Sequence, residues 1–278
     1  CLHLLGSCSG SFCGNLADDA PAENDKRAHM TLPAAFTETG FFATRAGDMP
    51  ITRFQVLGER SSGTNFVKRL LGRNTGLTPT EALGWKHGPP HMMAVPGDMA
   101  VICVVRRADS WARSMFEKPW HTTPEMQAQP FSQFIRAPWT TIIDRPRYFR
   151  GLMPEGSVGS PLQQDRDPAT GLPFANLFAL RRSKLACLLT LPARGCTCVV
   201  LRMEDVQADP QGTLAQLSAV LGVTAVAPYR PVVKRLGSKF KPSVPERRVL
   251  PDDWDDADHA FLRAAIDPDQ EAMLGYTY

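Results

Sequence analysis

Residues 54–71 read Phe-Gln-Val-Leu-Gly-Glu-Arg-Ser-Ser-Gly-Thr-Asn-Phe-Val-Lys-Arg-Leu-Leu, and they carry the clearest sign of a fold class in the sequence. The apolar run at its start ends at Gly58, as a strand does where it enters a loop. Phe66 and Leu70 then recur at helical spacing, so a helix is expected after Gly63. A strand, a glycine-containing loop and a helix in this order place free N–H groups and the positive end of the helix dipole where they bind an anion.

Gly58 and Gly63 are separated by four residues, which is the spacing of the first part of a Walker A loop. A nucleoside triphosphatase needs Lys directly after the second glycine and then Ser or Thr to bind Mg²⁺. Thr64 and Asn65 stand at those positions, so an anion with fewer charges and no metal is expected. An ordinary strand–helix turn capped by Ser and Thr is the alternative. The candidate cofactor-binding residues of the loop are Arg60, Ser61, Ser62, Gly63, Thr64 and Asn65.

A second apolar run, over residues 100–105, leads into Arg106. It is apolar throughout, which is typical of a strand buried on both faces of a parallel sheet. Ser114 follows eight residues after Arg106, in an expected helix whose N-cap we assign to Asp109. Because ligands of such sheets bind at the carboxyl ends of the strands, Arg106 and Ser114 are expected to meet one anion beside the first loop. An exposed Arg and a helix-surface Ser are the alternative for this pair taken alone.

The rest of the chain alternates between expected strands and helices. A third strand is expected over residues 197–201, with helices over residues 176–191, from Asp209-Pro210 to Gly222, and around residues 256–266. This alternation predicts an α/β fold of three layers, with a mainly parallel central sheet flanked by helices. The expected organisation is a poorly ordered N-terminal arm over residues 1–48 and a single domain over residues 49–278, with a long Pro- and Gly-rich loop at residues 144–174.

Four motifs in this order resemble those of the P-loop sulfotransferases that use 3′-phosphoadenosine 5′-phosphosulfate (PAPS). In that family the first loop wraps the 5′-phosphosulfate, and an Arg with a Ser eight residues later binds the 3′-phosphate, as Arg106 and Ser114 would. The segment Trp85-Lys86-His87-Gly-Pro-Pro90 is similar to the one that carries the family's catalytic His, and residues 201–210 resemble its later strand end with Glu-Asp and Asp-Pro. The resemblance covers residues 54–222. It implies a three-layer P-loop fold and a PAPS-dependent sulfotransferase without a metal.

The resemblance also implies catalytic roles for Lys86 and His87. His87 would remove the proton of the acceptor hydroxyl, or amine, as the acceptor attacks sulfur in line with the leaving phosphate. A structural His that caps the following turn is the alternative, and His121 is a further candidate for the base. Ser61 stands where the family has a basic residue, with Arg60 one position earlier, so either Arg60 or Lys86 would contact the bridging oxygen.

The acceptor, a small molecule or a saccharide, would bind between residues 119–139 and the loop at residues 144–174. Six rings there would stack on a sugar or an aromatic acceptor, or else form core: Trp120, Phe131, Phe134, Trp139, Tyr148 and Phe149. Four arginines would favour an acidic acceptor, or else form a solvated basic face: Arg136, Arg145, Arg147 and Arg150. The basic stretch Lys234–Lys241 is the candidate cover of the 3′-phosphate and the adenine.

The composition excludes several classes of protein. The 278 residues include 31 Lys and Arg against 28 Asp and Glu, a net charge of +3, which is too near balance for a general nucleic-acid binder. The longest strictly apolar run, Met99–Val105, is far shorter than the roughly 20 residues of a membrane helix. The seven cysteines form no Cys-x-x-Cys pair, which favours free thiols, no metal site and a cytoplasmic protein. The chain starts at Cys1 rather than Met, so residues before it are expected.

Two other functions are open on the same residues. An ATP-dependent P-loop kinase would need the Lys and the Mg²⁺ ligand that Thr64 and Asn65 replace. A non-catalytic nucleotide-binding or scaffold protein would keep the fold without the chemistry. The joint presence of His87, Arg106 and Ser114 favours the enzyme over the scaffold.

Overall fold

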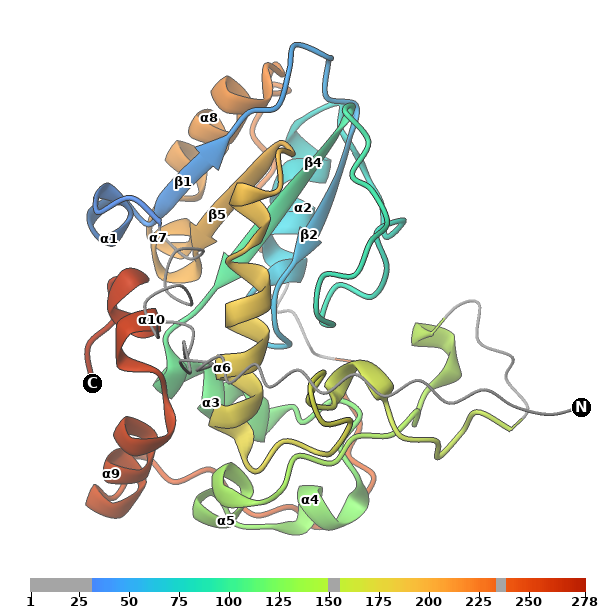
Figure 1. The fold of residues 1–278 in the computed structure, drawn as a ribbon, viewed down its shortest axis with the longest axis vertical. Helices are drawn as coiled ribbons and strands as arrows, with labels where there is room; N and C mark the ends of the chain where they lie inside the picture. The colour runs from blue at the N-terminus through green and yellow to red at the C-terminus, as the bar shows by residue number, and fades with distance from the viewer. Residues whose placement is uncertain (1–31, 150–155, 234–238) are drawn as a thin grey trace, which may run out of the picture.

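The computed structural model describes residues 32–149, 156–233 and 239–278. These residues form an α/β fold in which a five-stranded sheet is flanked by helices (Figure 1). The strands follow the order β1-β5-β4-β2-β3 across the sheet. Their bounds are Phe41–Thr44 for β1, Arg53–Leu57 for β2, Thr78–Pro79 for β3, Met99–Val105 for β4 and Cys198–Arg202 for β5.

The sheet is mixed, and the prediction of a mainly parallel sheet is corrected accordingly. The pairs β2–β3, β2–β4 and β4–β5 are parallel, whereas β1 runs antiparallel to β5, with Phe41 opposite Leu201 and Thr44 opposite Cys198. A parallel neighbour needs a crossover connection, but an antiparallel edge strand does not. β1 therefore joins the edge directly from the N-terminal segment. Its sequence, Phe-Phe-Ala-Thr, shows no alternation that would have marked it as a strand.

The domain begins before residue 49, where the sequence analysis placed a poorly ordered arm. Helix α1 (Ala35–Thr39) precedes β1, and the ring of Phe36 is fully buried in the core. The carbonyl oxygen of Thr37 accepts a hydrogen bond from Arg202 at the end of β5. Tertiary packing thus orders a segment that has little propensity of its own. Residues 1–31 of the predicted arm lie outside the described residues.

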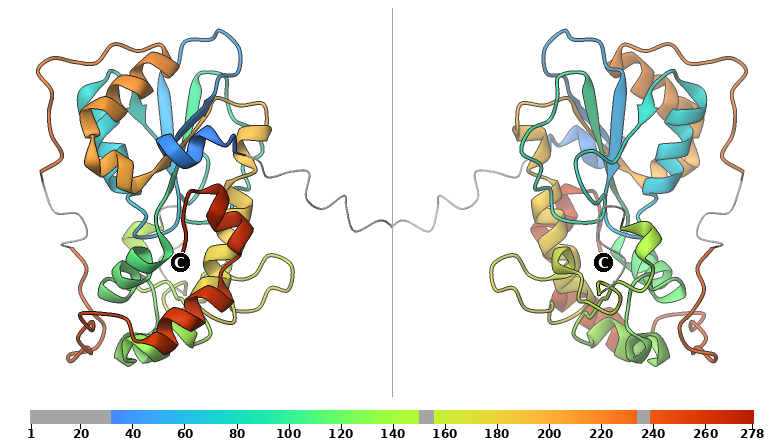
Figure 2. Two further views of the ribbon diagram at one scale, coloured as in Figure 1. Left: turned by 90° about the vertical axis from the view of Figure 1, so that its left-hand side faces the viewer. Right: turned by 90° about the vertical axis from the view of Figure 1, so that its right-hand side faces the viewer.

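Helices cover both faces of the sheet (Figure 2). One face is covered by α2 (Thr64–Asn74), α7 (Met203–Ala208) and α8 (Pro210–Leu221), and the other by α1, α6 (Leu177–Leu188) and α10 (Pro268–Met273). The central strand β4 lies between these layers, and all seven of its residues are buried. Val101 and Cys103 point into one core, and Ile102 and Val104 into the other. The expected strand buried on both faces is confirmed.

A third core lies beyond the carboxyl ends of the strands, in the lower part of Figure 1. It is built by the first half of α6 and by α3 (Ala108–Glu117), α4 (Pro124–Ala128), α5 (Phe131–Arg136) and α9 (Asp256–Ala265). Trp111, Phe134 and Trp139 are fully buried in it. These bulky rings pack α3 against α5 and α6, and α3 is the helix that carries Ser114.

The helix ends agree with their sequence signals in most places. Asn176 caps α6, and Asp209 caps α8, which ends at Gly222 in the left-handed conformation (φ 66°). The start of α3 differs from the prediction. Arg107 is its N-cap residue, and Asp109 lies in the first turn, where its carboxylate accepts from the Arg107 guanidinium at 3.0 Å. Asp109 therefore forms an ion pair with Arg107 instead of capping the helix.

The long loop (residues 144–174) is anchored to the domain along its described part. It contains two short 3₁₀ turns, Pro146–Tyr148 and Gln163–Asp165, and a bridge joins Ile142 to Pro161. Asp165 is 1% exposed. The loop thus carries a carboxylate into the interior, next to the carboxyl end of the sheet.

Candidate functional site

Several backbone N–H groups of the loop between β2 and α2 have no partner among the described residues. Gly58 (φ 155°), Ser61 (φ 63°) and Gly63 (φ 101°) all have positive φ, which turns the chain sharply before α2. No hydrogen bond within the described part of the chain involves the N–H groups of Ser61, Gly63, Thr64 or Asn65. Successive free N–H groups at the start of a helix form a concave site for an anion. The loop therefore holds the donors that an anion needs.

Gly58 lies so close to the central strand that a side chain is expected to destabilise the fold. A β-carbon on Gly58 would lie 2.5 Å from the carbonyl oxygen of Val104, which is fixed in β4. We expect Gly58→Ala to lower the free energy of unfolding by about 1–3 kcal/mol in urea denaturation. Gly76→Ala is the matched control, because nothing lies within 4 Å of a β-carbon there. Equal losses in the two variants would contradict this close approach.

The structure brings Arg106 and Ser114 together against the loop. Nη1 of Arg106 donates to Oγ of Ser114 (2.9 Å) and to the carbonyl oxygen of Ser61 (3.1 Å). Nε of Arg106 donates to Oγ of Ser110 (3.1 Å), one turn before Ser114 on the same face of α3. Burial lowers the pKa of Arg106, but a guanidinium stays charged at any ordinary pH. The guanidinium of Arg106, together with the hydroxyls of Ser110 and Ser114, therefore lies beside the free N–H groups of the loop.

Two hydrogen bonds hold the segment of Lys86 and His87 against the loop. The N–H of Gly58 donates to the carbonyl oxygen of Lys86 (3.0 Å), and Nδ1 of His87 lies 2.7 Å from the carbonyl oxygen of Gly58. Because a carbonyl oxygen only accepts, Nδ1 carries the proton, and Nε2 of His87 has a lone pair. The ammonium of Lys86 donates to Oδ1 of Asn65 (2.7 Å) and so lies at the N-terminus of α2.

His87 is neutral in the folded chain. Burial, helped by the charge of Lys86, holds the pKa of His87 well below its ordinary value of 6.5. The unfolded chain binds a proton there more readily, so the stability of the fold falls as the pH drops below about 6.5. We expect the melting temperature to fall from roughly pH 7 to pH 5, and to fall less in His87→Gln. Burial also lowers the pKa of His121, so His121→Gln should act in the same direction. An unchanged pH profile in both variants would contradict the buried neutral imidazoles.

Arg60 points away from the anion-binding groups, although the sequence analysis included it among the donor-binding residues. Its side chain is 2% exposed. Nη2 donates to Oδ2 of Asp165 (2.6 Å), and Nη1 donates to the carbonyl oxygen of Trp120 (3.1 Å). The guanidinium also lies 5.6 Å from the ring centroid of Trp85 and 5.4 Å from that of Trp139. With these partners, Arg60 fastens the loop to the rest of the site.

Asp165 joins two buried cations. One carboxylate oxygen accepts from Arg60 and the other from the ammonium of Lys184. Lys184 also donates to the carbonyl oxygen of His87 (2.7 Å) and lies 3.2 Å from Oε2 of Glu59. Burial alone would raise the pKa of Asp165, but the charges of Arg60 and Lys184 outweigh it and hold that pKa well below its ordinary value. This buried ion network connects the loop, the His87 segment, α6 and the long loop.

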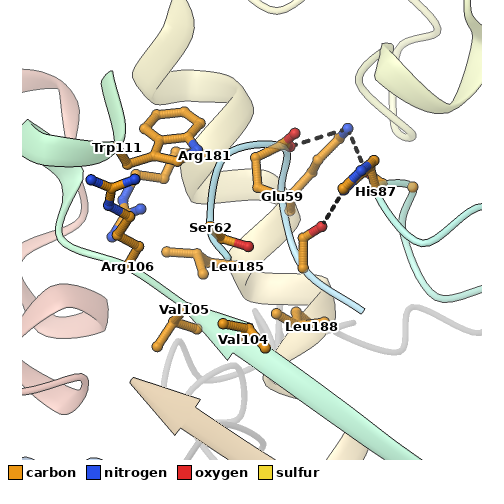
Figure 3. A pocket seen from close by; sticks show the side chains of 13 residues that line it. Glu59, Ser62, His87, Val104, Val105, Arg106, Trp111, Arg181, Leu185 and Leu188 are labelled. Atoms are coloured by element: carbon orange, nitrogen blue, oxygen red, sulfur yellow. Dashed lines mark hydrogen bonds and ion pairs between the residues drawn. The ribbon is translucent and has the colours of Figure 1, made fainter. Parts of the chain in front are cut away.

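Figure 3 shows how the side chains surround the loop: Arg106 lies on one side of Ser62, and Glu59 and His87 lie on the other. The cavity between them has a volume of about 20 Å³, which is room for one water molecule. The hydroxyl of Ser62 is buried there with no hydrogen-bond partner in the part of the chain that is described. Thr64 is buried as well, whereas Asn65 is exposed. A larger ligand of the loop must therefore lie outside this cavity.

The six rings predicted for the acceptor side fall into two groups. Phe131, Phe134 and Trp139 belong to the third core. The other three gather round His121, with ring centroids 4.8–6.2 Å from its imidazole: Trp120, Tyr148 and Phe149. Phe240 packs on Trp120 at 5.3 Å, so the described end of the basic stretch lies beside this second group. Residues 234–238 of that stretch lie outside the described residues.

The four arginines predicted near the acceptor have different partners. Arg136 forms an ion pair with Asp258. Arg145 and Arg147 lie over the rings of Trp120 and Tyr148, at 4.9 Å and 5.0 Å. Arg150 lies outside the described residues. A basic, ring-lined region thus surrounds His121.

The sequence analysis missed the buried ion network. Lys184 carried one usable signal, because it falls on the apolar face of α6 together with Leu177, Leu180 and Leu188. A Lys on such a face indicates a buried cation that needs an acidic partner. The role of Asp165 could not be predicted from the sequence, because Asp165 lies in an irregular loop and only the tertiary fold brings it to Arg60 and Lys184.

No family model, no curated protein and no solved structure matches this chain. Residues 32–149, 156–233 and 239–278 contain no cluster of His, Cys, Asp and Glu suited to a metal ion. They also contain no helix with the length and apolar character needed to cross a bilayer. The four cysteines in these ranges are free thiols.

Proposed function

We propose that this chain is a sulfotransferase with a three-layer P-loop fold. It moves the sulfuryl group of PAPS to the hydroxyl or amine of a small-molecule or saccharide acceptor. One observation carries the proposal: the free N–H groups of the loop, the Arg106–Ser114 pair and the neutral imidazole of His87 all lie at the carboxyl ends of β2 and β4. Ligands of open α/β sheets bind at this edge.

PAPS has two anionic groups that suit the two sets of donors. The N–H groups of Gly63, Thr64 and Asn65 suit the 5′-phosphosulfate, and Arg106 with Ser114 suits the 3′-phosphate. A guanidinium presents several N–H donors in a fixed planar arrangement, so it binds a phosphate in a defined orientation and also supplies a positive charge. An ATP-dependent kinase fits less well, because Thr64 supplies neither the charge nor the reach of the Lys that holds the β- and γ-phosphates.

The proposed reaction is an in-line displacement at sulfur. A bond forms between the acceptor oxygen and sulfur, while the bond from sulfur to the bridging oxygen breaks. The electron pair stays on the bridging oxygen, which leaves as part of 3′-phosphoadenosine 5′-phosphate. Nε2 of His87 takes the acceptor's proton, and Lys86 stabilises the charge that grows on the bridging oxygen.

Turnover of the donor tests this proposal. The wild-type chain is incubated with PAPS and a set of phenols, alcohols, amines and saccharides, and 3′-phosphoadenosine 5′-phosphate is measured by chromatography. We expect its release to depend on the acceptor and to match the sulfated product formed. Consumption of ATP with Mg²⁺ in place of PAPS would indicate a kinase. Binding of PAPS without turnover would indicate a non-catalytic nucleotide-binding protein.

Arg106→Ala is expected to weaken the binding of 3′-phosphoadenosine 5′-phosphate by roughly 10–100-fold. The variant loses hydrogen bonds to a charged group, worth about 1.5–3 kcal/mol, and each 1.4 kcal/mol is about tenfold in affinity. Calorimetric titration measures the change. Arg73→Ala is the matched control, because Arg73 is exposed in the last turn of α2 and donates to the carbonyl oxygen of Pro231. An affinity of Arg106→Ala within about twofold of the wild type would contradict the assigned contact.

A further inference from the structure

A second histidine in this region, His121, pairs with the carboxylate of Asp144, whose other oxygen lies 3.3 Å from Nε of Arg145. Nδ1 of His121 lies 2.6 Å from Oδ1 of Asp144, and the residue is 5% exposed. An ionised carboxylate only accepts, so Nδ1 carries the proton and Nε2 keeps a lone pair. His87 and His121 thus have the same tautomer. A neutral carbonyl fixes the first imidazole, and a carboxylate fixes the second.

The backbone of His121 is strained. Its φ is 67°, in the left-handed region that residues with a side chain rarely adopt. Neighbouring hydrogen bonds hold it there: the N–H of Ile142 donates to the carbonyl oxygen of His121 (2.8 Å), and the N–H of Thr122 donates to that of Pro119 (3.2 Å). Strain of this kind persists where the surrounding structure fixes it, and it gathers at functional sites.

Two contacts place His121 in the same region as His87. The ring centroid of Trp85 lies 5.6 Å from that of His87 and 6.3 Å from that of His121. Arg60 donates to the carbonyl oxygen of Trp120, the residue before His121, and is joined through the buried ion network to the His87 segment. Both imidazoles therefore border Trp85.

The two imidazoles differ in how well they can hold a proton. A protonated His87 would be a cation among three positive side chains: Lys86, Arg60 and Lys184. Its Nδ1 partner is a carbonyl oxygen without a charge. Burial and the charge of Arg60 lower the pKa of His121, but the carboxylate of Asp144 at its Nδ1 opposes them, and His87 has no such partner. Nε of Arg145 lies 3.3 Å from the other oxygen of that carboxylate. A carboxylate at Nδ1 stabilises an imidazolium and fixes its orientation.

We propose that His121, oriented by Asp144, is a second catalytic base of this site. This step rests on the sulfotransferase function proposed above. One proton leaves the acceptor hydroxyl for each sulfuryl group transferred. Water between the two imidazoles carries it from Nε2 of His87 to Nε2 of His121, where Asp144 stabilises the imidazolium, and solvent takes it after the products leave.

The strained backbone makes a clean test possible. Glycine adopts the φ of residue 121 without cost, so His121→Gly removes the imidazole and keeps the backbone. The readout is release of 3′-phosphoadenosine 5′-phosphate from PAPS with water as the acceptor, beside calorimetric titration of that product. We expect the rate of His121→Gly to fall by roughly 100-fold or more, with unchanged product affinity, and added imidazole to restore at least about a tenth of the lost rate. Asp144→Asn should slow the reaction at least about tenfold.

His91→Gly is the matched control. His91 is exposed, and its Nε2 pairs with the amide of Gln164, so its loss should leave the rate unchanged. A His121→Gly rate within about threefold of the wild type overturns the proposal, and so does a lost rate that imidazole does not restore. Failure of the sulfotransferase function gives another result, because the wild type would then break down no PAPS with water or with any of the acceptors tested above. Product binding in such a wild type would indicate the non-catalytic nucleotide-binding protein and would overturn the roles of both histidines.

Discussion

Asp165→Ala is expected to lower the free energy of unfolding by about 3–5 kcal/mol, the largest loss of stability that we predict for one substitution. The variant leaves Arg60 and Lys184 buried without their shared carboxylate. Glu59 alone would then face both cations, at 3.2 Å from each, and one carboxylate does not compensate two buried charges for their lost hydration. The loss is a large part of the roughly 5–15 kcal/mol that stabilises a typical domain. Urea denaturation at neutral pH measures it.

Asp98→Ala is the control for this prediction. Asp98 also binds an Arg through two oxygens, at 2.8 Å and 2.9 Å from Arg53, but this pair lies at the surface. Water can replace the lost partner there, so the loss of stability should be much smaller. Similar losses in Asp165→Ala and Asp98→Ala would contradict the buried ion network. Asp165→Ala should also raise the susceptibility of the long loop to proteolysis, because Asp165 anchors that loop.

His87→Ala is expected to lower the turnover of PAPS by roughly 100–10,000-fold, which is the usual contribution of a general base. The variant removes the imidazole whose Nδ1 binds Gly58 and whose Nε2 has the lone pair. The affinity for 3′-phosphoadenosine 5′-phosphate should change little, because the free N–H groups and Arg106 remain. Steady-state turnover and calorimetric titration of the same preparation separate the two effects.

His91→Ala is the control for His87→Ala, since both histidines lie in the segment before β4 and His91 is exposed. Its turnover should equal that of the wild type. Near-normal turnover in His87→Ala would contradict the role assigned to His87. A parallel loss of product affinity would instead show that the variant has disturbed the loop.

The part of the site that follows regular elements was predictable from the sequence. The strands β2 and β4 are apolar runs that end at a Gly and at an Arg, and parallel strands end at one edge of a sheet. Arg106 lies just before α3, and its long side chain reaches along the first turns of that helix to Ser110 and Ser114, which are one turn apart on the same face. Asp209 and Gly222 marked both ends of α8.

The remaining part depends on tertiary contacts that leave no local pattern. Arginine is a common anion-binding residue, but the guanidinium of Arg60 is buried, where it packs against two tryptophans and pairs with Asp165. The partner of His121 is Asp144, in an irregular loop 23 residues later, and no periodicity links the two. β1 joins the sheet through its backbone and through the burial of Phe36, which local propensity does not reveal.

Thermal unfolding in the presence of 3′-phosphoadenosine 5′-phosphate tests the proposed donor site most directly. A ligand at about 100 times its dissociation constant stabilises a fold by about 2.7 kcal/mol, which raises the melting temperature by several degrees. We predict this rise for the wild type and its loss in Arg106→Ala, with no rise from ATP and Mg²⁺. A rise from ATP and Mg²⁺ alone, or no rise from either ligand, would contradict the proposed donor site.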